Sequence, residues 1–354
     1  MLKEKIFLYA KDVIDGKKKN FFLSKVLSFL AIFFRFGSFF RNLLYNLNIL
    51  KAKKVKCKVI SIGNIVAGGT GKTPFTIFLA KKLIDKYKLA IISRGYKSIA
   101  ENSSIVINKE SKFLASEVGD ETLLLKNHIK NASFFIGKDK LNSAKKASKM
   151  NFDIALIDDG FQYRKLKKDI EIVIINAIDP FGKNNFLPKG YLRENPKNLK
   201  RADFIVINNA NSKINSLENE IKKYSNSPII YSSLYPNKFL NLSKKEIKID
   251  KNEKIAVFSA IANPNIFFKT LKDMGFQIVN SLYLLDHEKI SKKKLDAFIK
   301  QSILKEAKFI VTTEKDAVKL NPNIKKNLQI IYLETHLKIT HNKHHLFALV
   351  EKIL

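Results

Sequence analysis

The chain has 354 residues, of which 45% are hydrophobic and 27% charged, with only 13 Gly and 8 Pro. This length allows two ordinary domains with a large core, and the composition excludes a small disulfide-stapled protein, a collagen-like chain and a wholly disordered one. The 65 Lys and Arg against 32 Asp and Glu give a net charge of +33, which attracts nucleic acid, phosphorylated metabolites or an anionic membrane face, unless it reflects compositional drift. The single cysteine, Cys57, allows no internal disulfide and fits a reducing, cytoplasmic compartment.

The N-terminal region has no pattern of a signal peptide, because no small-residue cleavage site follows its apolar run. Residues 21–50 are mostly apolar, but Lys25, Arg35 and Arg41 interrupt them. The longest uncharged stretch, Val26–Phe34, is too short to span a bilayer. We predict an amphipathic helix that lies in the membrane interface. The alternative is a helix packed on the protein's own core.

The rest of the chain alternates short β-branched runs with helix-length polar segments, a pattern typical of βα units on a parallel sheet. Buried strands are predicted near Val55, Lys88, Phe152, Ile170, Ala202, Lys254 and Lys308. Open sheets of this class bind ligands at the carboxyl ends of their strands. The predicted organisation is a membrane-docking region at 1–50, a nucleotide-binding lobe at 51–168, a second α/β lobe at 169–335 and a C-terminal helix at 336–354 that packs on either lobe.

The strongest motif lies directly after the first predicted strand and opens a helix. It consists of Gly68, Gly69, Thr70, Gly71, Lys72 and Thr73. In such a loop the backbone N–H groups bind phosphate oxygens, Lys72 meets the β and γ phosphates, and the Thr73 hydroxyl ligates Mg²⁺. One position departs from the usual phosphate-binding loop, because Val66 stands where a glycine is usual. The alternative is a chance glycine-rich turn.

Paired acids follow two further elements. Asp158 and Asp159 end a strand, where a carboxylate beside a phosphate-binding loop commonly holds Mg²⁺. The alternative is a tight Asp-Gly turn. Asp120 and Glu121 begin a helix, so they are either a base or metal-binding pair or an electrostatic helix cap.

Three other polar positions carry candidate chemistry. Arg94 ends a strand and is placed to meet phosphate, with a surface arginine as the alternative. Arg193 follows a Pro- and Gly-containing turn, and its guanidinium suits phosphate. His287 follows Asp286 after an apolar run, and it either orients a carboxylate or lies on a surface loop.

Taken in order, these segments resemble the tetraacyldisaccharide 4'-kinase family, the lipid A 4'-kinases. The resemblance covers most of the chain after Lys54. It is carried by GNIVAGGTGKTP (63–74), SRGY (93–96), VGDE (118–121), DDGFQ (158–162), LPKGYLRE (187–194), ANP (262–264), DH (286–287) and TEKDAVK (313–319). The family also lacks the first glycine of the phosphate-binding loop, as this chain does at Val66.

The resemblance implies a P-loop NTPase-like α/β fold of two α/β/α lobes with mainly parallel sheets, and an N-terminal helix docked on the membrane. It implies ATP and Mg²⁺ as cofactors, with Lys72 and Thr73 at the nucleotide. Asp158, Asp159 and Glu121 would hold the metal. Asp120 would be the catalytic base and His287 its partner, which replaces the cap interpretation. Lys72 is also expected to be catalytic.

The resemblance places two further residues at the nucleotide, Arg193 at the phosphates and Asn263 in a nearby loop. Three positions depart from the family pattern and bear on the substrate side. Tyr163 stands where histidine is usual, and Lys189 and Tyr191 replace smaller residues.

The implied function is transfer of the γ-phosphate of ATP to the 4'-hydroxyl of tetraacyldisaccharide 1-phosphate, a glycolipid, to give lipid IVA. The implied location is peripheral, on the cytoplasmic face of the bacterial inner membrane, without nucleic acid or an obligate protein partner.

One alternative is a P-loop nucleotide hydrolase that acts as a switch or on another acceptor. The chain lacks the guanine-selective [NT]KxD and DxxG elements of GTPases, since Lys315 is one place late and Ile157 stands three before Gly160. Nucleic-acid binding, the other alternative, leaves the phosphate-binding loop and the acids unexplained.

Overall fold

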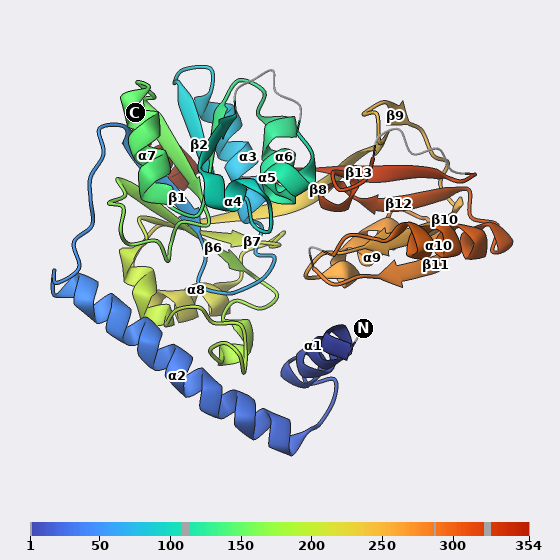
Figure 1. The fold of residues 1–354 in the computed structure, drawn as a ribbon, viewed down its shortest axis with the longest axis horizontal. Coiled ribbons are helices and arrows are strands. Elements are labelled where there is room, and N and C mark those ends of the chain that lie inside the picture. Colours follow the sequence, from blue (N-terminus) through green and yellow to red (C-terminus); the bar gives the residue numbers. More distant parts are fainter. Residues whose placement is uncertain (1, 108–112, 287, 322–326, 354) are drawn as a thin grey trace.

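The computed structural model describes residues 2–107, 113–286, 288–321 and 327–353 (Figure 1). Its helices are α1 (Leu2–Ile14), α2 (Phe21–Asn46), α3 (Lys72–Leu83), α4 (Ala100–Ser103), α5 (Ala115–Val118), α6 (Asp120–His128), α7 (Lys140–Lys149), α8 (Asn215–Lys222), α9 (Pro264–Asp273), α10 (Lys292–Leu304), α11 (Glu314–Ala317) and α12 (Lys343–Ile353), with the 3-10 helices η1 (Gly182–Asn184) and η2 (Pro196–Arg201). Its strands are β1 (Lys58–Gly63), β2 (Leu89–Ser93), β3 (Ile105–Ile107), β4 (Ser133–Ile136), β5 (Ile154–Asp158), β6 (Ile170–Asn176), β7 (Phe204–Asn208), β8 (Ile229–Asn241), β9 (Glu246–Ile247), β10 (Lys254–Ser259), β11 (Gln277–Tyr283), β12 (Phe309–Thr313) and β13 (Gln329–His341).

The described strands form one sheet, in the order β11-β10-β12-β13-β8-β7-β6-β1-β5-β2-β4-β3, with β9 on β8. All pairs are parallel except β3 with β4, β8 with β9 and β8 with β13. The predicted α/β fold with mainly parallel pairing is therefore confirmed. The strand order changes direction at β1, which lies between β5 and β6, and such switch points are where open α/β sheets bind ligands.

Two long antiparallel strands, β8 and β13, join a larger group of strands, β1–β7, to a smaller group, β10–β12 (Figure 1). The first residues of β8 pair with β7, and the first residues of β13 pair with β12. Strands β6 and β7 follow the predicted domain boundary at residue 168 and extend the group that contains β1. The division of the chain into domains stays a prediction.

The strands next to the phosphate-binding loop are buried on both faces, as their apolar runs predicted. On one face, Ile60 of β1 and Leu156 of β5 pack in a cluster with Phe75 of α3. On the other face, Val59 packs in a cluster with Ala144 of α7. Because both faces are covered by helices, the ends of these strands are fixed on a rigid support.

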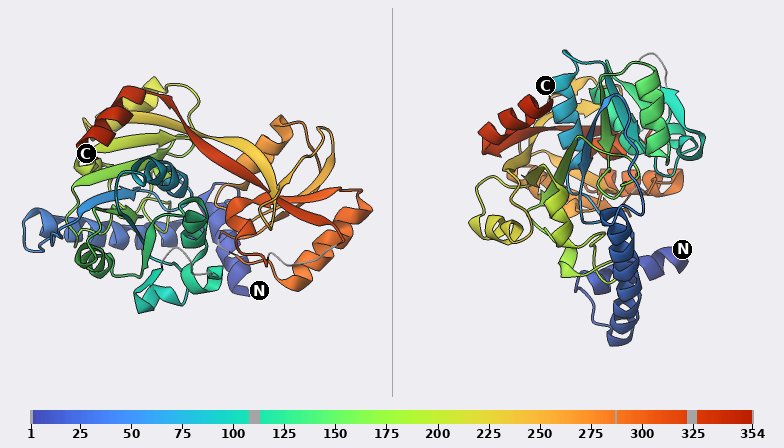
Figure 2. Two further views of the ribbon diagram at one scale, coloured as in Figure 1. Left: turned by 90° about the horizontal axis from the view of Figure 1, so that it is seen from above. Right: turned by 90° about the vertical axis from the view of Figure 1, so that its left-hand side faces the viewer.

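The C-terminal helix α12 packs on the larger group of strands. Its buried residues Leu346 and Leu349 belong to the same cluster as Ile60 and Phe75. Lys58 Nζ also donates to the carbonyl oxygen of Ile353, at 2.7 Å. In Figure 2, α12 lies at the opposite end of the molecule from α10.

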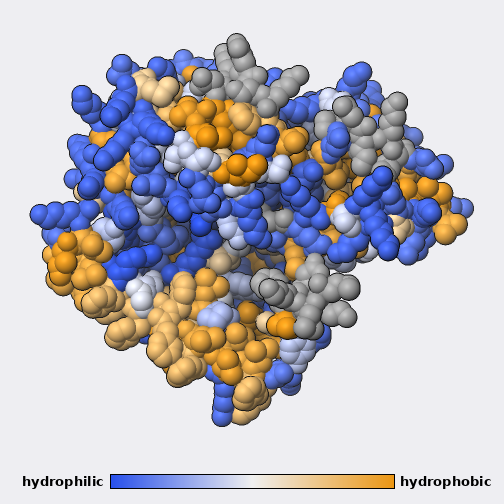
Figure 3. Space-filling model, viewed as in Figure 1, coloured by the Kyte–Doolittle hydropathy of each residue, from blue (hydrophilic) through white to orange (hydrophobic). Residues whose placement is uncertain are grey.

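Helix α2 runs along the outside of the molecule, and an apolar band on the surface follows it (Figure 3). Its exposed large apolar side chains are Phe21, Phe22, Val26, Phe29, Leu30, Ile32, Phe33, Phe34, Phe36, Phe39 and Phe40. Among the described residues, α2 alone is long and apolar enough to cross a membrane by length and composition.

The C-terminal half of α2 is bound to the protein through polar contacts. Ser38 Oγ donates to the carbonyl oxygen of Arg193 at 3.3 Å, and Arg41 pairs with the buried Glu194 at 3.0 Å. Arg164 donates to the Asn42 side chain at 3.1 Å. One part of the helix is thus held by the protein, and its apolar surface is left uncovered.

Packing of α12 predicts a specific stability effect. Leu349→Ala should lower the free energy of unfolding by about 2–5 kcal/mol, because the side chain is fully buried and its removal leaves a cavity. Phe347→Ala, on the same helix but 66% exposed, is the matched control and should have little effect. Urea unfolding would measure both. Equal destabilisation by the two variants would contradict the packing of α12 on the larger group of strands.

Candidate active site

The phosphate-binding loop lies between β1 and α3, as predicted, and asparagines at the ends of β1 and β7 hold it. Asn208 Nδ2 donates to the carbonyl oxygen of Thr70 at 3.1 Å, and Asn64 Nδ2 donates to the Thr70 hydroxyl at 2.9 Å. Gly71 has a φ of 94°, and a Cβ on it would lie 2.1 Å from Asn208 Nδ2. Only glycine fits at this position, because a side chain would meet both backbone strain and a clash.

The segment 187–194 runs beside this loop and explains the unusual Val66. The backbone of Val66 forms an antiparallel bridge with Leu192, and both side chains are buried in the same cluster. Val66 is not among the residues with positive φ, so its position does not require glycine. The neighbouring Arg193 N–H donates to the carbonyl oxygen of Ile65 at 2.8 Å, which brings Arg193 to the loop.

The turn at the end of β5 collects charged groups from several elements. Asp159 Oδ1 lies 3.4 Å from Lys72 Nζ, and both Asp159 carboxylate oxygens lie 3.0 Å from Arg193 Nη1. Burial would raise the pKa of Asp159, but Lys72 and Arg193 outweigh it and hold the pKa well below its usual range. Burial, reinforced by Glu121, instead raises the pKa of Asp158. The turn thus offers one firmly ionised carboxylate and one whose ionisation a nearby cation would favour.

The acids of α6 are paired with lysines from the smaller group of strands. Asp120 Oδ2 lies 3.8 Å from Lys319 Nζ, and Glu121 Oε1 lies 3.4 Å from Lys315 Nζ. The N-cap of α6 is Gly119 rather than Asp120, although Asp120 Oδ1 accepts a hydrogen bond from the Glu121 N–H at 2.9 Å. Asp120 therefore stands inside the first turn of the helix, buried and beside a cation.

Lys315 also connects this helix end to the predicted Asp-His pair. Its Nζ lies 3.3 Å from Asp286 Oδ1, between that residue and Glu121. Burial would lower the pKa of Lys315, but Glu121 and Asp286 outweigh it and raise the pKa. His287, the predicted partner of Asp120, lies outside the described residues. Lys315 therefore connects Asp286, the residue before His287, to Glu121 in the first turn of α6.

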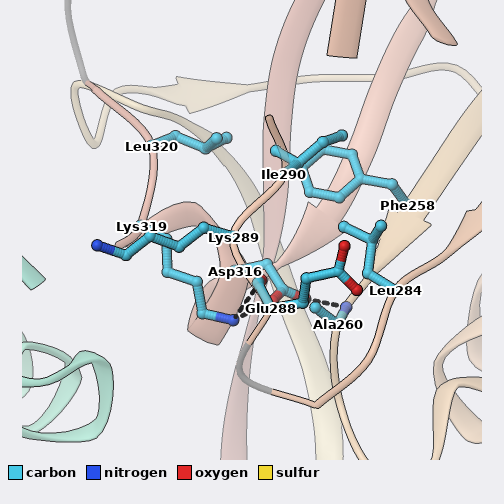
Figure 4. Close-up of a pocket in the computed structure, with 9 residues that line it drawn as sticks. All are labelled: Phe258, Ala260, Leu284, Glu288, Lys289, Ile290, Asp316, Lys319 and Leu320. Carbon is cyan, nitrogen blue, oxygen red and sulfur yellow. Dashed lines mark hydrogen bonds and ion pairs between the residues drawn. The ribbon is translucent and has the colours of Figure 1, made fainter. Parts of the chain in front are cut away.

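Lys319 lines a small cavity together with Asp316, which holds its ammonium group (Figure 4). Asp316 Oδ1 pairs with Lys319 Nζ at 2.8 Å, and Asp316 Oδ2 accepts from the Ala260 N–H at 2.9 Å. Thr313 Oγ1 donates to the same carboxylate at 2.7 Å. The buried carboxylate of Asp316 thus fixes the ammonium that stands beside Asp120.

The segment of residues 262–263 lies against the phosphate-binding loop, and its role at the nucleotide stays a prediction. A Cβ placed on Gly69 would be 3.4 Å from the Ala262 Cβ. Asn263 follows directly, is exposed, and begins α9 as its N-cap. By contrast, Arg94 pairs with Glu101 at 2.6 Å on the surface, which agrees with the surface alternative for that residue.

The three departures from the family pattern each have a defined contact. Lys189 Nζ donates to Ser24 Oγ, and Tyr191 Oη donates to Asp15 at 2.7 Å, so both bind the N-terminal helical region. Tyr163 Oη donates to Asp139 Oδ1 at 2.7 Å. The first two contacts connect segment 187–194 to the N-terminal region.

Sequence reasoning missed several residues that hold the site. They are Lys140, Asn176, Asn208, Lys315 and Lys319, of which Asn176 holds the phosphate-binding loop, because its Nδ2 donates to the carbonyl oxygen of Gly69 at 3.4 Å. Asn176 and Asn208 end predicted strands, and the two later lysines lie in the TEKDAVK segment, so a signal existed for these four. Lys140 lies in none of the motifs.

Comparisons with known proteins agree on one family. The family model described as Tetraacyldisaccharide-1-P 4'-kinase (LpxK) matches residues 23–354. The chain is 35% identical to a tetraacyldisaccharide 4'-kinase of Halothermothrix orenii, over 89% of both chains. It is 40% identical to that of Chlamydia caviae, over 74% of this chain and 72% of the relative.

One solved structure of this family has the same fold over nearly the whole chain. It is the crystal structure of LpxK from Aquifex aeolicus, described as an "apo" form in complex with ATP. The TM-score is 0.73 at 26% identity, covering 94% of this chain and 99% of the other. The family match, the curated relatives and this fold together show that the chain belongs to the tetraacyldisaccharide 4'-kinase family and has its kinase activity in lipid A biosynthesis.

Proposed function

We propose that this site transfers the γ-phosphate of ATP, with Mg²⁺, to the 4'-hydroxyl of tetraacyldisaccharide 1-phosphate. The observation that carries this proposal is the convergence of Lys72 and Arg193 on the Asp158–Asp159 turn, directly beside the phosphate-binding loop. The Aquifex aeolicus relative, solved in complex with ATP, supports ATP as the nucleotide. Phosphoryl transfer depends mainly on positioning and charge neutralisation, and this edge supplies both cations and carboxylates.

The residues present fit a magnesium ion. Asp158 Oδ1 is buried and has no hydrogen-bond partner among the described residues, so a polar atom there is left for a ligand. Carboxylate and hydroxyl oxygens suit Mg²⁺, and we assign Thr73, Glu121, Asp158 and Asp159 to its surroundings. When bound, Mg²⁺ would neutralise charge on the transferring phosphate.

Lys72 and Arg193 are the proposed phosphate-binding cations. Both contact Asp159, which limits the rotation of two long side chains and keeps them beside the phosphate-binding loop. The loop backbone of residues 68–71 and the start of α3 add N–H donors. Binding a polyphosphate here would therefore cost little additional ordering.

Asp120 is the proposed base that takes the proton from the sugar hydroxyl. It is 8% exposed, it lies at the start of α6, and its Oδ2 lies 3.8 Å from Lys319 Nζ. His287 is the proposed partner that holds or relays charge beside Asp120. The contact between Asp286 and Lys315 supports this, because it places the residue before His287 near the acids of α6.

We also propose that α2 docks peripherally on the cytoplasmic face of the inner membrane. The polar contacts of Ser38 and Arg41 with segment 187–194 hold one end of the helix against the site, which is difficult to combine with a full crossing. The exposed phenylalanines would enter the leaflet that also contains the acyl chains of the substrate. The proposed partners are thus a glycolipid and a membrane surface.

Phosphate transfer tests the whole assignment. The native protein with Mg²⁺, detergent and labelled ATP should phosphorylate a tetraacyldisaccharide 1-phosphate acceptor. Lys72→Ala should abolish transfer while the thermal melt is retained, because a phosphate-binding charge is lost. The matched control is Lys81→Ala on the exposed side of the same helix, which should remain active. ATP hydrolysis by the native protein without transfer would instead support the hydrolase alternative.

Replacement of the proposed base tests the role of Asp120. Asp120→Asn should lower the rate of the chemical step about 10²–10⁴-fold, because general-base catalysis contributes that much. Nucleotide affinity should be retained, since Asp120 is not assigned to the phosphates. Single-turnover kinetics and calorimetry would measure the two quantities, with Asp85→Asn, away from the site, as the control. An unchanged rate would return Asp120 to a structural role in the first turn of α6.

Vesicle binding tests the membrane surface. Phe29→Ser combined with Phe33→Ser removes two adjacent exposed rings, whose centroids are 5.0 Å apart. Binding to anionic vesicles should fall about 10²-fold or more, because each buried ring contributes about 1.5–3 kcal/mol. Phe347→Ser combined with Leu304→Ser, also exposed but on α12 and α10, is the control. Co-sedimentation would measure both, and an equal loss in the two pairs would argue against docking through α2.

A further inference from the structure

Lys140 is a buried cation beneath the Asp158–Asp159 turn, and the proposed reaction leaves it without a role. Only 5% of the residue is exposed, which is rare for lysine because an ammonium group loses its hydration on burial. Burial accordingly lowers the pKa of Lys140. A buried charge of this kind is retained only where neighbouring groups compensate it.

The compensating groups are the two carbonyl oxygens of the turn itself. Lys140 Nζ donates to the carbonyl oxygen of Asp158 at 2.7 Å and to that of Asp159 at 2.5 Å. Asp159 has a φ of 52°, in the left-handed region that non-glycine residues seldom adopt. One ammonium group thus holds two consecutive carbonyls on both sides of a strained residue.

The position of Lys140 is itself fixed by residues on both sides of it in the chain. Asp139 is the N-cap of α7, and its side chain accepts from the Asn142 N–H at 3.1 Å. Tyr163 Oη donates to the same Asp139 oxygen and accepts from the Leu141 N–H at 3.2 Å. Tyr163, one of the departures from the family pattern, therefore anchors the start of the helix that carries Lys140.

The contacts separate Lys140 from the residues proposed to meet phosphate. Lys72 and Arg193 contact the carboxylate of Asp159, whereas Lys140 contacts backbone oxygens and is buried. Its hydrogen bonds to the two carbonyl oxygens fix the direction in which the side chains of both acids leave the backbone. It acts through the turn rather than on the phosphate.

We propose that Lys140 is a positioning residue that holds the Asp158–Asp159 turn in the conformation that binds Mg²⁺. This inference rests on the metal role proposed above for these two acids. It extends that role to a residue outside the motifs, and to Tyr163 as the anchor of α7. The required group is a cation long enough to reach both carbonyls.

The test compares Lys140→Met, which keeps the length but removes the charge, with Lys140→Arg, which keeps a donor cation. The measurement is the affinity for a non-hydrolysable ATP analogue by calorimetry, as a function of Mg²⁺ concentration and without turnover. Lys140→Met should raise, about 10-fold or more, the Mg²⁺ concentration at which the affinity for the analogue has increased by half of its full amount. Lys140→Arg should bring this concentration most of the way back to the native value. Tyr163→Phe should raise the same concentration, but by less than Lys140→Met.

Lys146→Met is the matched control, because Lys146 lies on the same helix and also donates to a backbone carbonyl, that of Ser104 at 2.9 Å, away from the turn. It should leave the Mg²⁺ dependence unchanged. Asp158→Asn tests the metal role separately. A shift with Asp158→Asn but none with Lys140→Met would overturn the inference and leave the proposed function standing. No shift with either variant would overturn both.

A merely structural role for Lys140 is distinguished by stability. If Lys140→Met lowers the melting temperature but the folded protein keeps the native Mg²⁺ dependence, the inference is wrong. If Lys140→Met does not fold, Tyr163→Phe decides. It should fold and raise the Mg²⁺ concentration that is needed, and a native Mg²⁺ dependence in this variant would overturn the inference.

Discussion

The site depends on keeping the adjacent carboxyl groups of Asp158 and Asp159 able to bind a ligand at the buried end of β5. A carboxylate that leaves water must be compensated, and here the compensation comes from distant parts of the chain. Lys72 opens α3, Lys140 opens α7, and Arg193 arrives on the segment beside the phosphate-binding loop. Each of these cations reaches the turn only when its own segment is correctly placed. The turn at the end of β5 is therefore the point at which α3, α7 and segment 187–194 are fixed relative to one another.

The same principle links the two groups of strands. Asp120 and Glu121 belong to a helix of the larger group, whereas their partners Lys319 and Lys315 come from the smaller one. Opposite charges are thus one of the contacts between the two groups, and the ribbon of β8 and β13 supplies the covalent connection. The distances within these charge pairs therefore depend on how the two groups of strands are placed relative to each other.

The sequence predicted the parts of the fold in which one local signal suffices. Continuous apolar runs identified β1, β5 and β7, since strands buried on both faces need apolar residues throughout. The long strands β8 and β13 gave no comparable run, because β8 is mostly half-buried in its middle and β13 is mostly half-buried from Glu334 to its end. Lys140 was missed for a related reason. Its role depends on burial and on contacts with residues 158 and 159, and neither is visible in the order of residues around position 140.

The place of α12 has a consequence for the order in which the protein can form. The cluster that supports the phosphate-binding loop contains Ile60 and Phe75 together with Leu349. Residues near the two ends of the chain must therefore come together to complete it. During synthesis, the apolar α2 is exposed long before residues 343–353 emerge from the ribosome. The surface that we propose to meet lipid is therefore synthesised before the nucleotide-binding core is complete. Contacts of such long range slow folding, and a membrane would be able to capture the nascent chain in the interval.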